Sequence, residues 1–259
     1  MMDQGSGPPV IVIPGIQGRW EWMEPALRAL VPTCRIISYS LAGDVGSECE
    51  PDRTLGFETY VQQLDRVFDR AGLSRAVLCG VSYGGFIALR YAATRPERVS
   101  GLILVSAPAP GWVPSARQQR YLAWPRLSAP LFVLSAPRRV WREIRSAIPS
   151  WPDRIRFALV HGARVAAAPL VPTHAAARIA AQQAADFSKD AALVKAPTLV
   201  VTGDDDLDRV VPPSVTRRYL ASIAGARYEQ LQGTGHIGML TQPDRFARLV
   251  SHFVHANHH

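Results

Sequence analysis

The chain has 259 residues, of which 47% are hydrophobic and 19% are charged. A chain of this size buries a large core, and its composition excludes the collagen-like, disordered and disulfide-rich classes. No apolar run approaches the roughly 18 residues that a transmembrane helix needs, and the N-terminus lacks a signal-peptide pattern. The three cysteines share no motif spacing, so we expect reduced thiols in a cytoplasmic protein and no metal site.

The formal net charge of +8 raises the question of nucleic-acid binding. Residues 111–190 hold twelve Arg or Lys and four Asp or Glu, whereas the rest of the chain holds seventeen of each sign. The basic residues form no known nucleic-acid-binding module, so we expect no nucleic-acid partner. A solvated basic surface is the simpler interpretation, and electrostatic attraction of an anionic substrate or surface is the alternative.

In chain order, short apolar runs alternate with stretches of helical periodicity. The apolar runs predict buried strands, because a parallel sheet that is covered on both faces needs continuous apolar strands. They are residues 10–13, 35–39, 76–79, 102–105 and 198–202, followed by a weaker run at 226–231. The predicted helices are residues 24–30, 57–71, 84–95, 213–223 and 243–255. This alternation predicts a doubly wound α/β fold with a mostly parallel sheet.

The alternation stops between residues 111 and 190. This segment has few strand signals, eight prolines and four of the six tryptophans of the chain. We expect it to form several short helices that are inserted into the sheet fold. The predicted domains are therefore a core of residues 1–110 and 191–259 and an insertion of residues 111–190.

The segment Gly80-Val81-Ser82-Tyr83-Gly84 follows a predicted strand and precedes a predicted helix. This is the context of a nucleophile elbow, in which a serine occupies a strained turn between small residues. A glycine-rich structural turn is the alternative, because the bare motif also occurs by chance. The weight of the motif therefore depends on what accompanies it elsewhere in the chain.

A second glycine turn, Pro14-Gly15-Ile16-Gln17-Gly18, directly follows the first predicted strand. Acyl transfer needs backbone N–H donors that point at the developing oxyanion. We expect the N–H of Ile16 to be one donor and the N–H of Tyr83, the residue after the serine, to be the other. Taken alone, this turn is equally consistent with an ordinary strand end.

Of the seven histidines, only His236 lies in a glycine-flanked loop after a strand-like run. Four others crowd the C-terminus, including His258 and His259, and two lie in the insertion without a partner motif. A catalytic histidine needs a buried carboxylate that holds its tautomer. Four aspartates compete for this role in the loop after residues 198–202, namely Asp204, Asp205, Asp206 and Asp208.

On these motifs, the chain resembles the α/β-hydrolase superfamily, and within it the small, cap-bearing, serine-esterase-like branch. The resemblance covers nearly the whole chain except residues 111–190, for which it implies a helical cap over Ser82. In that family, a loop of the form Asp-x-x-x-Pro carries the acid of the Ser-His-Asp triad. Counting back from Pro212 selects Asp208 and counting forward from Gly203 selects Asp206, and we favour Asp208. Pro14 stands where the family often has a histidine, which leaves the backbone donor intact.

The resemblance implies a serine hydrolase that cleaves carboxylic esters of small, apolar substrates through an acyl-enzyme. Ser82, Asp208 and His236 would form the triad, and no metal or organic cofactor would be needed. A lactonase, thioesterase, acyltransferase or carbon–carbon bond hydrolase would use the same triad and stays open. A serine nucleophile argues against haloalkane dehalogenases and epoxide hydrolases, which need a carboxylate there. A non-catalytic ligand-binding protein of this fold is less favoured, because it predicts a broken triad.

We expect three tryptophans to line an apolar substrate pocket, namely Trp20, Trp124 and Trp141. Phe132, in the insertion, is a further candidate. For each of these aromatic residues, ordinary packing between the cap and the core is the alternative.

Overall fold

A seven-stranded sheet in the order β1-β3-β2-β4-β5-β6-β7 forms the centre of the computed structural model. The structure describes residues 1–52 and 54–257, and it describes the backbone alone at 117, 128–134, 136 and 137. The neighbours from β3 to β7 pair in parallel, and β1 pairs antiparallel with β3. The strands are β1 (Met2–Gln4), β2 (Pro9–Ile13), β3 (Arg35–Ser38), β4 (Ala76–Val81), β5 (Val99–Val105), β6 (Thr198–Thr202) and β7 (Arg227–Gln230). The predicted doubly wound, mostly parallel sheet is confirmed.

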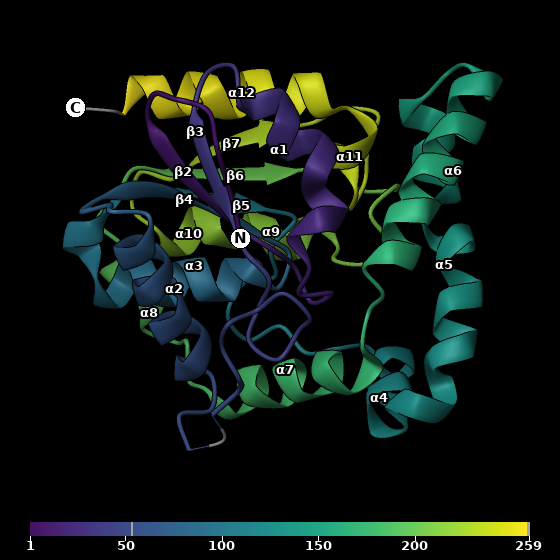
Figure 1. The fold of residues 1–259 in the computed structure, drawn as a ribbon, viewed down its shortest axis with the longest axis horizontal. Coiled ribbons are helices and arrows are strands. Elements are labelled where there is room, and N and C mark those ends of the chain that lie inside the picture. Colours follow the sequence, from purple (N-terminus) through teal and green to yellow (C-terminus); the bar gives the residue numbers. More distant parts are fainter. Residues whose placement is uncertain (53, 258–259) are drawn as a thin grey trace.

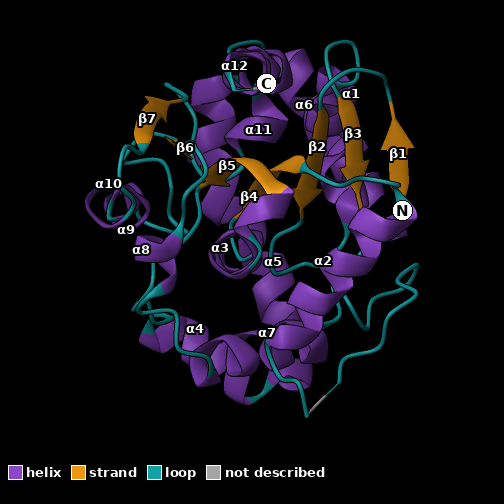
Figure 2. Cartoon of the chain, turned by 90° about the vertical axis from the view of Figure 1, so that its left-hand side faces the viewer, coloured by secondary structure: helices purple, strands orange, loops and turns teal. Residues whose placement is uncertain are grey.

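Helices cover both faces of this sheet (Figures 1 and 2). The first face carries α1 (Glu24–Leu30), α11 (Gly238–Thr241) and α12 (Pro243–Ala256). The second carries α2 (Glu58–Arg70), α3 (Gly84–Thr94), α8 (Asp190–Leu193), α9 (Pro213–Arg217) and α10 (Tyr219–Ser222). Two short 3-10 turns complete the core, at Trp20–Met23 and Pro96–Arg98.

Alternate side chains of each central strand enter opposite apolar clusters. Along β2, Val10 and Val12 pack under α1 and α12, whereas Ile11 and Ile13 pack under α2 and α3. Successive side chains of a strand point to opposite faces, so a sheet between two helical layers needs apolar residues at every position. This double burial is the physical reason for the continuous apolar runs in the sequence.

Two elements differ from the sequence prediction. Strand β1 is not predicted, because only Met2 of its three residues is buried and no apolar run marks it. The helix expected over residues 213–223 is divided at Arg218 into α9 and α10. Neither difference changes the order of the parallel strands that carry the candidate site.

Residues between β5 and α8 form four helices that lie beside the core rather than in its layers (Figure 1). They are α4 (Ala116–Ala123), α5 (Pro125–Ala147), α6 (Trp151–Ala167) and α7 (Pro172–Ala184). The expectation of short helices is wrong for α5, whose 23 residues continue through Pro130 and Pro137. An internal proline removes a backbone hydrogen bond and favours a kink, but packing and neighbouring turns can maintain the helix. We call α4 to α7 the cap, and the exact domain boundaries stay a prediction.

The cap is attached to the core by polar contacts of α6. The guanidinium Nε of Arg164 lies 2.8 Å from Oε2 of Glu24 on α1. The indole N–H of Trp22 donates to the carbonyl of Ala168, just after α6, at 2.7 Å. In the described ranges, no helix combines the length and apolarity that crossing a membrane requires.

Candidate active site

Ser82 occupies the tight turn between β4 and α3. Its φ of 51° lies in the left-handed region, which a non-glycine residue rarely adopts outside functional sites. A Cβ atom at Gly80 would lie 2.6 Å from the carbonyl oxygen of Gly84, and one at Gly84 would lie 2.4 Å from that of Ile13. Both positions therefore require glycine, and the turn holds the serine above the end of the sheet.

Three of the side chains singled out in the sequence lie in one hydrogen-bonded line. Nε2 of His236 is 3.1 Å from Oγ of Ser82, and Nδ1 of His236 is 3.0 Å from Oδ2 of Asp208. Ser82 follows β4, Asp208 follows β6, and His236 follows β7. The carboxyl ends of parallel strands meet at one edge of a sheet, so residues far apart in sequence converge there.

Of the two aspartates that the sequence left open, Asp208 is the one beside His236. Its side chain is 1% exposed, and its Oδ1 accepts the backbone N–H groups of Val210 and Val211, both at 2.9 Å. The side chain of Asp206 is 71% exposed and lies 3.5 Å from Arg142. The N–H groups hold the Asp208 carboxylate in place and leave its second oxygen for the imidazole.

The electrostatic surroundings favour a charged imidazole at His236. Burial by itself lowers the pKa of His236, because a charged ring loses hydration. The charge and hydrogen bond of Asp208, together with the charge of Glu143, outweigh this effect, so the pKa is raised above its usual value. The site therefore stabilises the imidazolium that forms when His236 accepts a proton.

The glycine turn after β2 lies beside the serine. A Cβ atom placed on Gly15 would be 3.3 Å from Cβ of Ser82. Within the part of the chain that the structure describes, the backbone N–H groups of Ile16 and Tyr83 donate to no protein oxygen. These are the two donors expected from the sequence, and both flank the position of Ser82.

A buried arginine of the cap supports both donor residues. The sequence did not predict a role for this arginine. Nη1 of Arg178, on α7, donates to the carbonyl of Ile16 at 2.9 Å. The hydroxyl of Tyr83 donates to the backbone carbonyl of Arg178 at 3.0 Å. Arg178 also forms an ion pair with buried Asp44, whose other oxygen lies 3.1 Å from Nδ1 of His174. No motif marks these residues, and their only signal is a charged side chain with no obvious partner.

The three tryptophans expected at the substrate pocket do not lie together. Trp20 is half-buried and packs against the apolar cluster beneath α1 and α12. Trp124, between α4 and α5, is 70% exposed. The ring of Trp141 meets that of Trp151 edge to face, with 6.1 Å between the ring centroids. Trp124 directly precedes α5 and Trp141 lies near its end, so the two residues are roughly 25 Å apart at 1.5 Å of rise per residue. The side chain of Phe132, like residues His258 and His259, lies outside the described part of the chain.

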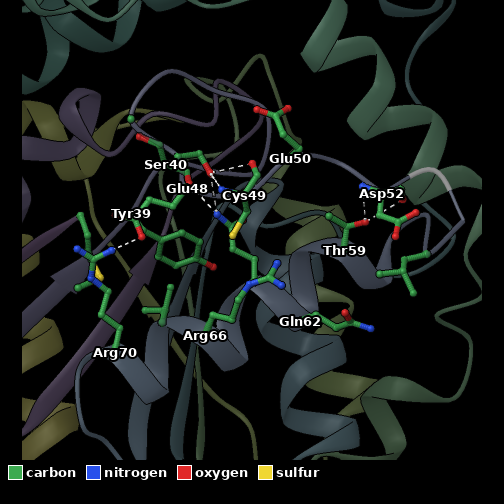
Figure 3. Close-up of a pocket in the computed structure, with 16 residues that line it drawn as sticks. Tyr39, Ser40, Glu48, Cys49, Glu50, Asp52, Thr59, Gln62, Arg66 and Arg70 are labelled. Carbon is green, nitrogen blue, oxygen red and sulfur yellow. Dashed lines mark hydrogen bonds and ion pairs between the residues drawn. The ribbon is translucent and has the colours of Figure 1, made fainter.

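Ser82 lines neither of two cavities in the structure. One of about 470 Å³ is lined by residues that include Tyr39, Cys49 and Arg66, between α2 and the loop before it (Figure 3). A second, of about 440 Å³, is lined by Arg142, Arg145, Ser146, Arg154 and Leu207. Neither includes Ser82, so the side-chain geometry, and not a cavity, locates the candidate site. Among the described residues, no group of three or more His, Cys, Asp or Glu side chains is arranged to hold a metal ion.

The sequence matches a known family over most of its length. The model of the alpha/beta hydrolase family matches residues 10–249. The chain belongs to the alpha/beta hydrolase family. The predicted family and the predicted enzyme class, a hydrolase, are both confirmed.

Several named proteins are similar to this alpha/beta hydrolase. The carbamate hydrolase RutD of Klebsiella pneumoniae (strain 342) is 29% identical over 259 residues, covering 94% of this chain and 90% of that protein. The poly(3-hydroxyalkanoate) depolymerase of Ectopseudomonas oleovorans is 25% identical, and the match covers 95% of this chain and 84% of that protein. An esterase from Exiguobacterium antarcticum has a similar fold, with a TM-score of 0.80 at 22% identity over 98% of this chain and 94% of that one. The enol-lactonase of Burkholderia xenovorans LB400 has a TM-score of 0.75 at 23% identity, covering 98% of this chain and 95% of that one.

Proposed function

We propose that this alpha/beta hydrolase is a serine esterase that cleaves carboxylic esters of small, apolar molecules through an acyl-enzyme on Ser82. The observation that carries the proposal is the line of hydrogen bonds from Ser82 through His236 to Asp208. A strained serine, a buried imidazole and a buried carboxylate in this order are the parts of nucleophilic acyl transfer. Carboxylic esters are the simplest acyl substrates for such a site.

In the first half of the reaction, neutral His236 accepts the hydroxyl proton of Ser82 at Nε2. The Ser82 oxygen attacks the acyl carbonyl carbon, and the carbonyl oxygen becomes an oxyanion. The N–H groups of Ile16 and Tyr83 donate to this oxyanion. Asp208 accepts the N–H at Nδ1 and stabilises the imidazolium, so His236 keeps the tautomer that the reaction needs.

In the second half, the tetrahedral intermediate collapses and the bond to the alcohol oxygen breaks. His236 returns its proton to the departing alkoxide, which leaves as the alcohol. A water molecule then gives a proton to His236 and attacks the acyl-serine carbonyl. Collapse of this second intermediate releases the carboxylic acid and restores the Ser82 hydroxyl, with His236 returning the proton.

Carbamates are the second candidate substrates. Relatives named carbamate hydrolase RutD, including one that is 29% identical, match this chain over nine-tenths of its length. A carbamate also carries a carbonyl bonded to an alcohol oxygen, with a nitrogen in place of the carbon that is attached to the carbonyl of an ester. Lactones and thioesters present related carbonyl groups, and transfer to an acceptor other than water would use the same acyl-enzyme.

A substrate panel with paired serine variants tests the proposal. We expect p-nitrophenyl esters of short acyl chains to be hydrolysed faster than matched thioesters, lactones and carbamates. Ser82→Ala removes the nucleophile and should abolish turnover. Ser106→Ala is the matched control, because Ser106 also has a positive φ and directly follows the neighbouring strand β5. Full activity of Ser82→Ala would refute the proposal, and a preference for carbamates would select the second candidate.

The remaining expectations concern the cellular setting. A cytoplasmic location, a small-molecule partner and the absence of a nucleic-acid partner all stay predictions. The basic charge of the cap makes salt dependence informative here. Attraction of an anionic substrate predicts that added salt lowers kcat/KM for anionic esters but not for neutral ones.

A further inference from the structure

Glu143 is a buried carboxylate that the mechanism above does not use. It lies on the cap helix α5 and is 1% exposed. Its two oxygens accept the backbone N–H of Ile237, at 3.0 and 3.2 Å. A carboxylate is rarely buried without an ion-pair partner, because the loss of hydration is costly. Ile237 directly follows His236, so the buried carboxylate contacts the loop that carries the histidine.

The carboxylate also touches the residue before the histidine. A Cβ atom at Gly235 would lie 2.8 Å from Oε2 of Glu143 and 2.7 Å from the carbonyl oxygen of Leu207. Gly235 therefore has to be glycine for the cap helix to approach this closely. Glu143 consequently contacts the backbone on both sides of His236.

The charges around Glu143 come from two core loops. His236 faces it from the loop before α11, and Asp208 faces it from the loop after β6. On α5 itself, Arg142 lies 3.5 Å from Asp206, and Arg139 donates to Ser135 at 2.7 Å. Among the described residues, no arginine or lysine side chain forms an ion pair with Glu143.

Burial raises the pKa of Glu143 to about 7, and the charge of Asp208 acts in the same direction. The N–H groups of Gly235 and Ile237 and the charge of His236 lower it, but by less. In the reverse direction, ionised Glu143 contributes to the raised pKa of His236. The charge of each group therefore affects the pKa of the other.

We propose that Glu143 is a positioning residue that holds the loop of His236 and supports its charged form, so that docking of cap helix α5 completes the triad. This inference rests on the proposed function. When the proton moves from Ser82 to His236, the charges of Asp208 and Glu143 both stabilise the imidazolium. The contact joins the cap to the reacting histidine, whereas Arg164 and Glu24 join the cap to α1 alone.

The test compares Glu143→Gln with Glu24→Gln. The glutamine keeps an oxygen acceptor for the N–H of Ile237 but removes the charge. Glu24→Gln is the matched control, because it removes a carboxylate that joins cap and core away from the histidine. The pKa of His236 is measured by NMR of protein with ¹⁵N-labelled histidine, in which a His236→Gln variant identifies the signal.

We expect Glu143→Gln to lower the pKa of His236, and Glu24→Gln to leave it unchanged. In the same variants, kcat/KM should fall roughly tenfold for Glu143→Gln, as for the loss of a charge-assisted contact, with little change in KM. In the unaltered protein, ¹³C-labelled glutamate should show one carboxyl that titrates near pH 7, which needs no variant.

Equal His236 titration curves in the unaltered protein and in Glu143→Gln would overturn the proposal. An equal shift in Glu24→Gln would also overturn it, because any cap contact would then have the same effect. No glutamate carboxyl titrating above pH 6 would overturn it as well. None of these readouts requires turnover, so they are distinct from failure of the proposed function, which shows as full activity in Ser82→Ala.

Discussion

The Oδ2 atom of Asp208 lies 3.0 Å from Nδ1 of His236, while its Oδ1 atom is held by two backbone N–H groups. One carboxylate thus has one oxygen fixed by the loop and one directed at the imidazole. Asp206, two residues earlier, is largely exposed and lies near Arg142. The two aspartates of this loop should therefore respond differently to substitution.

Asp208→Asn should lower kcat by roughly 10⁴-fold, because an amide favours the wrong tautomer of the histidine. Asp206→Asn should change kcat less than threefold, since exposed ion pairs contribute little. Initial rates of ester hydrolysis at saturating substrate measure both variants. A larger loss in Asp206→Asn would move the triad acid to that residue.

Gly84→Ala should destabilise the fold by about 3 kcal/mol, because the added methyl would overlap backbone atoms that cannot move aside. Activity should fall as well, since the same backbone holds Ser82. Gly162→Ala, on α6, is the control: a Cβ there meets nothing within 4 Å, and the change should stabilise by up to about 1 kcal/mol. Urea unfolding measures both, and an unchanged midpoint in Gly84→Ala would contradict the tight geometry of the turn.

Asp44→Asn should destabilise the fold by roughly 3 to 5 kcal/mol, because it leaves the buried guanidinium of Arg178 without its counter-charge. Arg178→Met in the same background should recover part of that loss, since it removes the unpaired charge. A double-mutant cycle by urea unfolding gives the coupling free energy. Strictly additive losses would show that the two side chains do not act as a pair. The kcat of Arg178→Met should also fall, because Arg178 holds the carbonyl of Ile16.

The kcat/KM of ester hydrolysis should rise with pH through the ionisation of His236, because only the neutral imidazole accepts the serine proton. Asp208 and Glu143 raise the pKa of His236, so half of the maximal value should be reached above pH 6.5. Asp208→Asn removes the main cause of this increase, so the residual activity of that variant should reach its half-maximum at lower pH. A midpoint below 6.5 in the unaltered protein would contradict the observed surroundings of the histidine.

The local parts of the site were predictable from the sequence. A strand, a glycine-flanked serine and a helix determine the turn of Ser82, since only residues within a few positions of it are involved. The same holds for the turn of Ile16 and for the glycine-flanked loop of His236. The parallel strands were also predictable, because burial on both faces leaves a continuous apolar run.

The parts that depend on tertiary packing were not predictable. Counting from the two ends of the aspartate loop selected two different residues, so the sequence favoured Asp208 over Asp206 without deciding between them. The decision depends on which carboxylate receives two N–H groups and faces the imidazole. Glu143 is 94 positions from Ile237, and Arg178 is 162 positions from Ile16. No periodicity reports such contacts. The short edge strand β1 was missed for a simpler reason, namely that two of its three residues are exposed.

Covalent labelling of Ser82 tests the central claim most directly. The protein is mixed with an activated ester, quenched with acid and digested with trypsin, and the peptide of residues 76–90 is analysed by mass spectrometry. This peptide also holds Cys79, but burial raises the pKa of its thiol to about 12, so it stays unreactive. We predict an acyl adduct on Ser82 in the unaltered protein and no adduct in Ser82→Ala. Acylation at another residue, with turnover retained in Ser82→Ala, would contradict the account.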